Sequence, residues 1–253
     1  MNAPAYACLC TVTIAGWLAV YRLPFGDPAR RRRVGLWLAD RTGLRPEAAF
    51  ALFGTLLYLL LGAAALALLG ASAGLSARQI VGRTSGNALL ALPLAICGTS
   101  SLNILCVSLL SRAKPGTDVP EEITRVQWIS SILSLPRHFR WMIPAVAAMV
   151  EELVFRGAVL LGLGAAGSGF VFAAIFSSVL FSVGQVVLVS TPVQAYVLGT
   201  SSLALGTVGS LLVAATGSVL PALALHMSFA GFYTNLSAAS SARPSTAPRR
   251  VSL

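Results

Sequence analysis

Long apolar runs limit this chain to a small set of possible folds. Seven of them follow one another, near residues 4–20, 48–71, 87–111, 141–164, 168–190, 194–214 and 217–236. Each approaches the roughly 20 residues that an α-helix needs to cross the hydrocarbon core of a bilayer. A backbone in lipid must satisfy its own hydrogen bonds, so only helices or a closed barrel qualify, and these runs lack the two-residue alternation of barrel strands. The sequence therefore predicts an all-α fold, a polytopic membrane helix bundle.

The composition agrees with a membrane domain. The chain of 253 residues is 56% hydrophobic and only 10% charged, whereas about 25% of the residues in a soluble domain are charged. We therefore expect about seven transmembrane helices. Six remain an alternative, in which the first run lies in the membrane interface.

The basic residues lie between the apolar runs and indicate an orientation. Seven arginines fall within 22–45, five basic residues within 112–140 and three within 243–250, but the connection after the second run holds only Arg78 and Arg83. Basic loops stay on the cytoplasmic side of a membrane. Seven spans satisfy this rule with a multi-pass topology whose C-terminus is cytoplasmic. The same clustering explains the net charge of +10 without a nucleic-acid partner.

Four parts of the chain differ in character. Residues 1–113 are predicted to hold the N-terminal transmembrane helices and a basic loop, 114–138 a polar linker, 139–236 a C-terminal helical core, and 237–253 a disordered basic tail. Within the first part, the basic segment 27–47 carries interspersed apolar residues. It fits an amphipathic helix on the inner leaflet and a plain charged loop equally well.

Three ionisable residues interrupt the fourth apolar run. Glu151, Glu152 and Arg156 lie within it, although one charge near the bilayer centre costs at least ~2.5–3.5 kcal/mol. Glu152 and Arg156 are four residues apart and share a helix face, so we expect them to pair. Glu151 points about 100° away and has no local partner. A purely structural alternative is a buried ion pair beside a neutral carboxylic acid that holds helices together.

Two further polar residues lie on later apolar runs. Gln185 follows Phe181-Ser182-Val183-Gly184, and His226 lies in the last run. An isolated histidine there could simply bind a backbone carbonyl, but two glutamates on a neighbouring helix favour a shared polar site. A zinc site is not expected, because the apolar runs hold one histidine and no HExxH pattern occurs. No metal and no other cofactor is predicted.

These residues resemble the motifs of a known family. Residues 151–157 read Glu-Glu-Leu-Val-Phe-Arg-Gly, which is similar to the EExxxR motif of the CPBP intramembrane proteases. That family includes CAAX prenyl proteases, bacteriocin-processing enzymes, and the Abi and lysostaphin-resistance-protein-like domains. The run 172–181 is similar to the helix that leads into the family's FxxxH motif, and His226 stands where its HxxxN (or HxxxD) motif begins.

The resemblance implies roles for individual residues. Glu151 would activate a water, Glu152 and Arg156 would support the site, and His226 would stabilise the oxyanion. Two motif positions are substituted: Gln185 stands in place of histidine and Ala230 in place of asparagine or aspartate. Gln185 can orient a water but cannot take up a proton, and losing one oxyanion donor costs ~10²–10³ in rate.

Three functions are consistent with these residues. The first is a CPBP-type intramembrane endopeptidase of weak activity, acting on a membrane protein or a lipidated peptide. The second is a catalytically inactive relative that binds a membrane partner in the same cavity. The third, a small proton-coupled transporter, would show paired broken helices in two halves, and no internal repeat is seen. The substrate, the organelle and the oligomeric state do not follow from the sequence.

Overall fold

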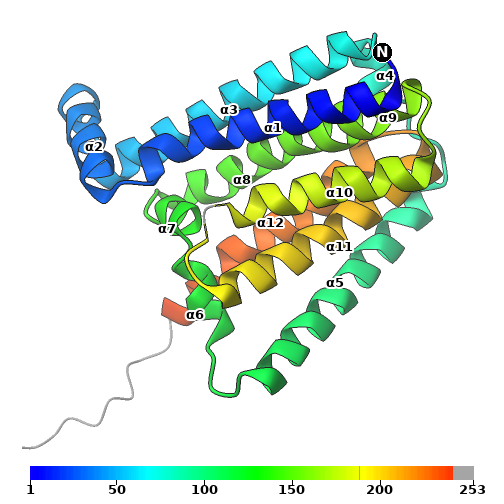
Figure 1. Cartoon of the computed structure of the whole chain (residues 1–253). Coiled ribbons are helices and arrows are strands. Elements are labelled where there is room, and N and C mark those ends of the chain that lie inside the picture. The colour runs from blue at the N-terminus through cyan, green and yellow to red at the C-terminus, as the bar shows by residue number, and fades with distance from the viewer. Residues whose placement is uncertain (188, 242–253) are drawn as a thin grey trace, which may run out of the picture.

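The computed structural model describes residues 1–187 and 189–241. Its helices (Figure 1) are α1 Ala3–Phe25, α2 Pro28–Thr42, α3 Pro46–Ser72, α4 Ala77–Val81, α5 Ala88–Ala113, α6 Val119–Thr124, α7 Gln127–Leu133, α8 Arg137–Glu152, the π-helical η1 Leu153–Leu160, α9 Leu161–Ala165, α10 Phe170–Val186, α11 Pro192–Thr216 and α12 Leu220–Ser241. Within this part of the chain the only β-type pairing is an isolated bridge between Gly82 and Ser218. The predicted all-α membrane helix bundle is confirmed.

Every predicted apolar run coincides with helix. Four helices, α1, α3, α5 and α11, are long and apolar enough to cross a membrane, while α10 and the first half of α12 are shorter apolar helices. The remaining run forms the continuous series α8, η1 and α9. The last run continues in helix to Ser241, five residues into the predicted tail, and residues 242–253 lie outside the described residues.

Most of the basic segment 27–47 forms a helix rather than a plain charged loop, and the location of this helix on the inner leaflet stays a prediction. The side chain of Asp27 caps the first turn of α2 by accepting from the Ala29 N–H at 2.9 Å, and Pro28 occupies the first turn. Gly43 ends the helix with φ +67°, a conformation that glycine adopts without steric cost. Leu36 and Trp37 are half exposed, as expected for a helix that lies on a membrane surface.

The predicted linker 114–138 is also largely folded. It forms α6 and α7, and the apolar residues Val119, Ile123, Val126 and Ile129 pack with α11 in a separate hydrophobic cluster. The side chain of Asp118 caps α6 by accepting from the Glu121 N–H at 3.0 Å. These short helices therefore close one end of the bundle.

The connections gather at two ends of the bundle (Figure 1). At one end, Arg45 donates to the carbonyl of Ser134 at 3.2 Å, which joins the two basic connections. At the other end, Ser85 N–H donates to the carbonyl of Thr216 at 3.0 Å, close to the Gly82–Ser218 bridge. Both arginine-rich connections thus lie at the same end, as the positive-inside rule requires. Which side of the membrane that end faces stays a prediction.

One hydrophobic cluster joins the N-terminal helices to the later ones. Trp17 of α1 stacks on Phe155 at a centroid distance of 6.4 Å, and Phe155 meets Phe181 edge to face at 5.3 Å. The cluster also contains Leu69 of α3 and Leu225 of α12. Residues 1–113 therefore share a core with residues 139–236, and α3 and α5 can contribute side chains to a site in that core.

Candidate active site

The adjacent glutamates end α8 just before the π-helical turn η1. Glu151 is 6% exposed and Glu152 is 1% exposed. Single π-helical turns inside helices often mark functional sites, because the wider turn re-aims the side chains that follow. Here the wider turn carries Arg156, which is completely buried.

The Arg156 side chain is buried between Glu152 and the ring of Phe181. Its Nη1 is 3.1 Å from Glu152 Oε1, and its guanidinium lies 4.5 Å from the centroid of the Phe181 ring. A Cβ added to Gly209 of α11 would approach Arg156 Nε to 3.2 Å, so glycine leaves room for the guanidinium. The ion pair is close but poorly aligned, and none of the three guanidinium nitrogens has a hydrogen-bond acceptor within the described residues. Glu152 therefore supplies most of the compensation for this buried charge.

His226 connects the two glutamates. Its Nδ1 is 2.8 Å from Glu152 Oε1, and its Nε2 is 3.5 Å from Glu151 Oε2. Since Glu152 faces Arg156 and accepts hydrogen bonds as a carboxylate, Nδ1 carries the proton of that contact. The imidazole then presents Nε2 to Glu151, as an acceptor when neutral and as a donor when protonated.

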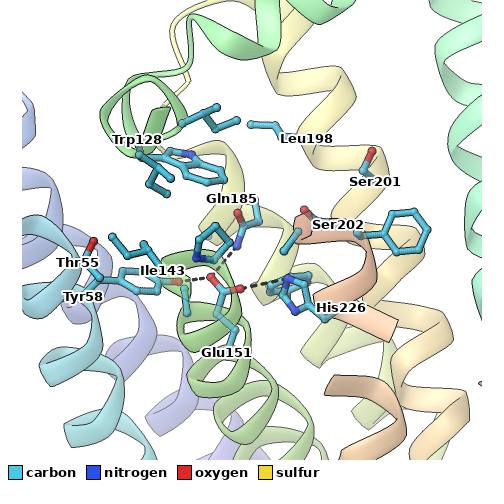
Figure 2. Close-up of a pocket in the computed structure, with 18 of the residues that line it drawn as sticks. Thr55, Tyr58, Trp128, Ile143, Glu151, Gln185, Leu198, Ser201, Ser202 and His226 are labelled. Carbon is cyan, nitrogen blue, oxygen red and sulfur yellow. Dashed lines mark hydrogen bonds and ion pairs between the residues drawn. The ribbon is translucent and has the colours of Figure 1, made fainter. Parts of the chain in front are cut away.

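Glu151 receives donors from two other helices. The Tyr58 hydroxyl on α3 donates to Glu151 Oε1, and Gln185 Nε2 on α10 donates to the same oxygen at 3.0 Å. Figure 2 shows both contacts together with that of His226. One oxygen of Glu151 is thus held by two donors. The other, Oε2, faces His226, which leaves Oε2 as the oxygen able to act on a bound water.

These groups lie at the wall of a partly open cavity of about 170 Å³ between the helices. Glu151, Gln185, His226 and Ala230 all line it, together with apolar residues such as Trp128 and Leu198. Ala230 presents a methyl group to the same space in which the family motif would place an amide or a carboxylate. The cavity is large enough for water and for part of an extended peptide.

The structure brings all five residues selected from the sequence into one network. Glu151, Gln185 and His226 face the cavity, while Glu152 and Arg156 stand behind His226. Their catalytic roles stay predictions. Within residues 1–187 and 189–241, no group of three or more histidine, cysteine or acidic side chains could hold a metal ion.

Sequence reasoning missed Tyr58. It is surrounded by leucines in the second apolar run, and one signal was available: tyrosines in membrane helices favour the interface, whereas this one lies at the centre of its span. Its ring packs between Trp17 and Tyr21 of α1, at centroid distances of 4.8 and 4.9 Å. Both neighbours hold the phenol toward Glu151.

Comparison with known proteins supports the motif-based resemblance. No curated protein and no solved structure matches the chain. Residues 135–232 match the family model described as type II CAAX prenyl endopeptidase Rce1-like. The matched segment runs from the start of α8 into α12 and contains every residue selected from the sequence, whereas Tyr58 lies outside it. Residues 135–232 of the chain are therefore similar to the Rce1-like CAAX prenyl endopeptidases, in agreement with the resemblance of its motifs to those of the CPBP intramembrane proteases.

Proposed function

We propose that the chain is an intramembrane endopeptidase that hydrolyses a peptide bond of a membrane-associated substrate with a water activated by Glu151. The observation that carries this proposal is the placement of Glu151, whose Oε2 faces a cavity shared with Gln185 and His226. A carboxylate held by fixed donors beside a space for water is what a general base needs. The Glu152–Arg156 pair supports the site from behind, because Glu152 orients His226.

The reaction follows from these positions. Glu151 Oε2 removes a proton from the water, and the water oxygen attacks the carbonyl carbon of the substrate. His226 Nε2, when protonated, donates to the oxyanion that forms. The C–N bond then breaks, and Glu151 returns the proton to the leaving amine. Gln185 and Tyr58 take no part in proton transfer and hold Glu151 Oε1 throughout.

A reconstituted assay tests this proposal. The purified chain in liposomes is incubated in H₂¹⁸O with a set of apolar, membrane-associated peptides, and the products are identified by mass spectrometry. Hydrolysis by an activated water places one ¹⁸O atom in the new carboxyl group. Absence of cleavage across the whole set, in a protein shown to be folded, would contradict the proposal.

An inactive relative that binds a membrane partner is the second candidate function. The substitutions at Gln185 and Ala230 favour it, because glutamine cannot accept a proton and alanine offers no donor. Restoring the family pattern with Gln185→His and Ala230→Asn is expected to raise the cleavage rate at least about tenfold, because an imidazole at position 185 can exchange a proton with the bound water, which an amide cannot do. The measurement is the initial rate in the same liposomes. No gain in a folded double variant would favour partner binding.

Tyr58→Phe is expected to lower kcat about 10- to 100-fold with little change in KM. The change removes a hydrogen bond to a charged group, worth ~1.5–3 kcal/mol, and keeps the ring that packs against Trp17 and Tyr21. Tyr196→Phe is the matched control. It removes a hydroxyl that donates to the Cys106 carbonyl at 3.2 Å, outside the cavity. Equal effects of both substitutions would show that the Tyr58 hydroxyl contributes only to folding.

A further inference from the structure

An amide on α5 has no place in the mechanism above. Asn103 lies within a long apolar helix, and its neighbours Leu102, Ile104 and Leu105 are exposed on the outside of the bundle. Asn103 itself lines the cavity that contains Glu151 and His226. The family match does not include Asn103, because the matched segment begins at residue 135.

The Asn103 side chain is unpartnered. Its Oδ1, which is an acceptor, is buried without a hydrogen bond, and its Nδ2, which is the donor, has no acceptor among the described residues. An unpaired amide in an apolar environment costs ~1–3 kcal/mol by mutational measures, and membrane interiors offer no bulk water to reduce that cost. A group bound in the cavity is therefore the expected partner of this amide.

Helix packing places Asn103 at the depth of the catalytic residues. The helices α5 and α11 run side by side in opposite directions (Figure 1), with Ser85 bonded to Thr216 near one end and Tyr196 to the Cys106 carbonyl near the other. Asn103 is one helical turn before Cys106, so it lies near the residues of α11 around Gly199. Ser182 of α10 donates to the carbonyl of Gly199 at 2.9 Å, which brings the turn of α10 before Gln185 to the same depth.

The cavity also lacks an amide at the position where the family motif carries one. Ala230, one turn after His226, lines the cavity where the family motif carries asparagine or aspartate. The helix α5 packs against α12 as well as against α11, so its side chains can reach the space that the methyl group of Ala230 leaves. An amide from another helix offers the same N–H donor as an amide at position 230.

We infer that Asn103 is a catalytic residue that contacts the carbonyl oxygen of the substrate and supplies, from α5, the oxyanion donor missing at Ala230. This inference rests on the proposed peptide hydrolysis. In the tetrahedral intermediate, Nδ2 of Asn103 donates to the oxyanion together with His226. The donor stabilises charge that develops only during the reaction, so its main effect is on kcat.

Four proteins test the inference: the native chain, Asn103→Ala, Ala230→Asn and the double variant. Asn103→Ala is expected to lower kcat ~10²–10³-fold, the cost of one oxyanion donor, with KM changed less than about threefold. Ala230→Asn is expected to recover most of this loss in the double variant and to add little to the native chain. Asn87→Ala, an exposed change at the start of the same helix, is the control for helix α5.

Recovery of kcat by Ala230→Asn separates a catalytic role of Asn103 from a structural one. An amide on α12 cannot repair a fold that depends on Asn103 in α5. Equal kcat in the native chain and Asn103→Ala would overturn the inference, and so would a loss that Ala230→Asn fails to recover. Glu151-dependent cleavage in either case would leave the proposed function standing.

If the native chain cleaves no peptide, the result counts against the proposed function. The role of Asn103 is then tested by a binding measurement. A phosphinate peptide carries a tetrahedral anionic centre in place of the scissile amide, and its affinity is compared with that of the matched amide peptide. The native chain is expected to prefer the phosphinate, and Asn103→Ala is expected to reduce that preference about 10- to 100-fold. An unchanged preference, or none in the native chain, would overturn the assignment.

Discussion

Glu151→Gln is expected to lower the rate of peptide cleavage about 10²- to 10⁴-fold and to leave the protein folded. Glutamine has the size and shape of glutamate and retains an oxygen that can accept from Tyr58 and Gln185. It cannot take a proton from water, so the loss falls on the chemical step. The measurement is kcat in liposomes, with the melting temperature in detergent as the test of folding.

The matched control for Glu151→Gln is Glu121→Gln. Glu121 is an exposed carboxylate on α6 that pairs with Arg125, and surface pairs of this kind contribute ~0–1 kcal/mol. Cleavage by this control should equal that of the native chain. If Glu151→Gln cleaves as fast as the control does, Glu151 is not the base, and the proposed mechanism is wrong.

Arg156→Ala is expected to destabilise the protein by ~3–5 kcal/mol, because it leaves Glu152 as a buried carboxylate without its cation. The guanidinium is 0% exposed, pairs with Glu152 at 3.1 Å and covers the Phe181 ring. Its removal also empties the space that Gly209 leaves open. Unfolding by sodium dodecyl sulfate in mixed micelles measures the loss, and the abundance of the protein in the membrane should fall with it.

A double-mutant cycle separates the charge from the packing. Arg156→Met keeps much of the volume of the side chain, and Glu152→Gln removes the partner charge. The combination Glu152→Gln with Arg156→Met is expected to be less destabilised than the two single effects added together, since the single changes each leave an unpaired buried charge. Strict additivity, or a normally stable Arg156→Ala protein, would show that the pair does not hold the site together.

The N-terminal helices contribute side chains to the candidate active site. Tyr58 of α3 and Asn103 of α5 reach the cavity from outside residues 135–232. The motif residues on α8, α10 and α12 therefore form an incomplete wall, which the N-terminal helices close. A chain shortened to the matched segment would lack the Tyr58 hydroxyl, one of the two donors to Glu151 Oε1, and the apolar contacts of Trp17.

Features that depend on local spacing could be predicted from the sequence. Long apolar runs predicted the membrane helices, because a helix in lipid needs about 20 apolar residues. The four-residue spacing predicted the Glu152–Arg156 pair, which forms even though η1 winds this segment as a π-helix. The selection of Glu151, Gln185 and His226 followed from polar residues that stand out in apolar runs.

The contacts between groups on different helices could not be predicted from the sequence and are seen in the packed structure. Glu152, rather than Glu151, receives Nδ1 of His226, and Glu151 receives Tyr58. In the sequence, Tyr58 and Asn103 lie in mostly apolar helices that also carry other polar residues, such as Thr55 and Ser101, so no periodic pattern singles out the face that turns inward. Their direction is set by how α3 and α5 pack against helices distant in the chain. Such packing depends on the shapes of many side chains at once, and no local spacing encodes it.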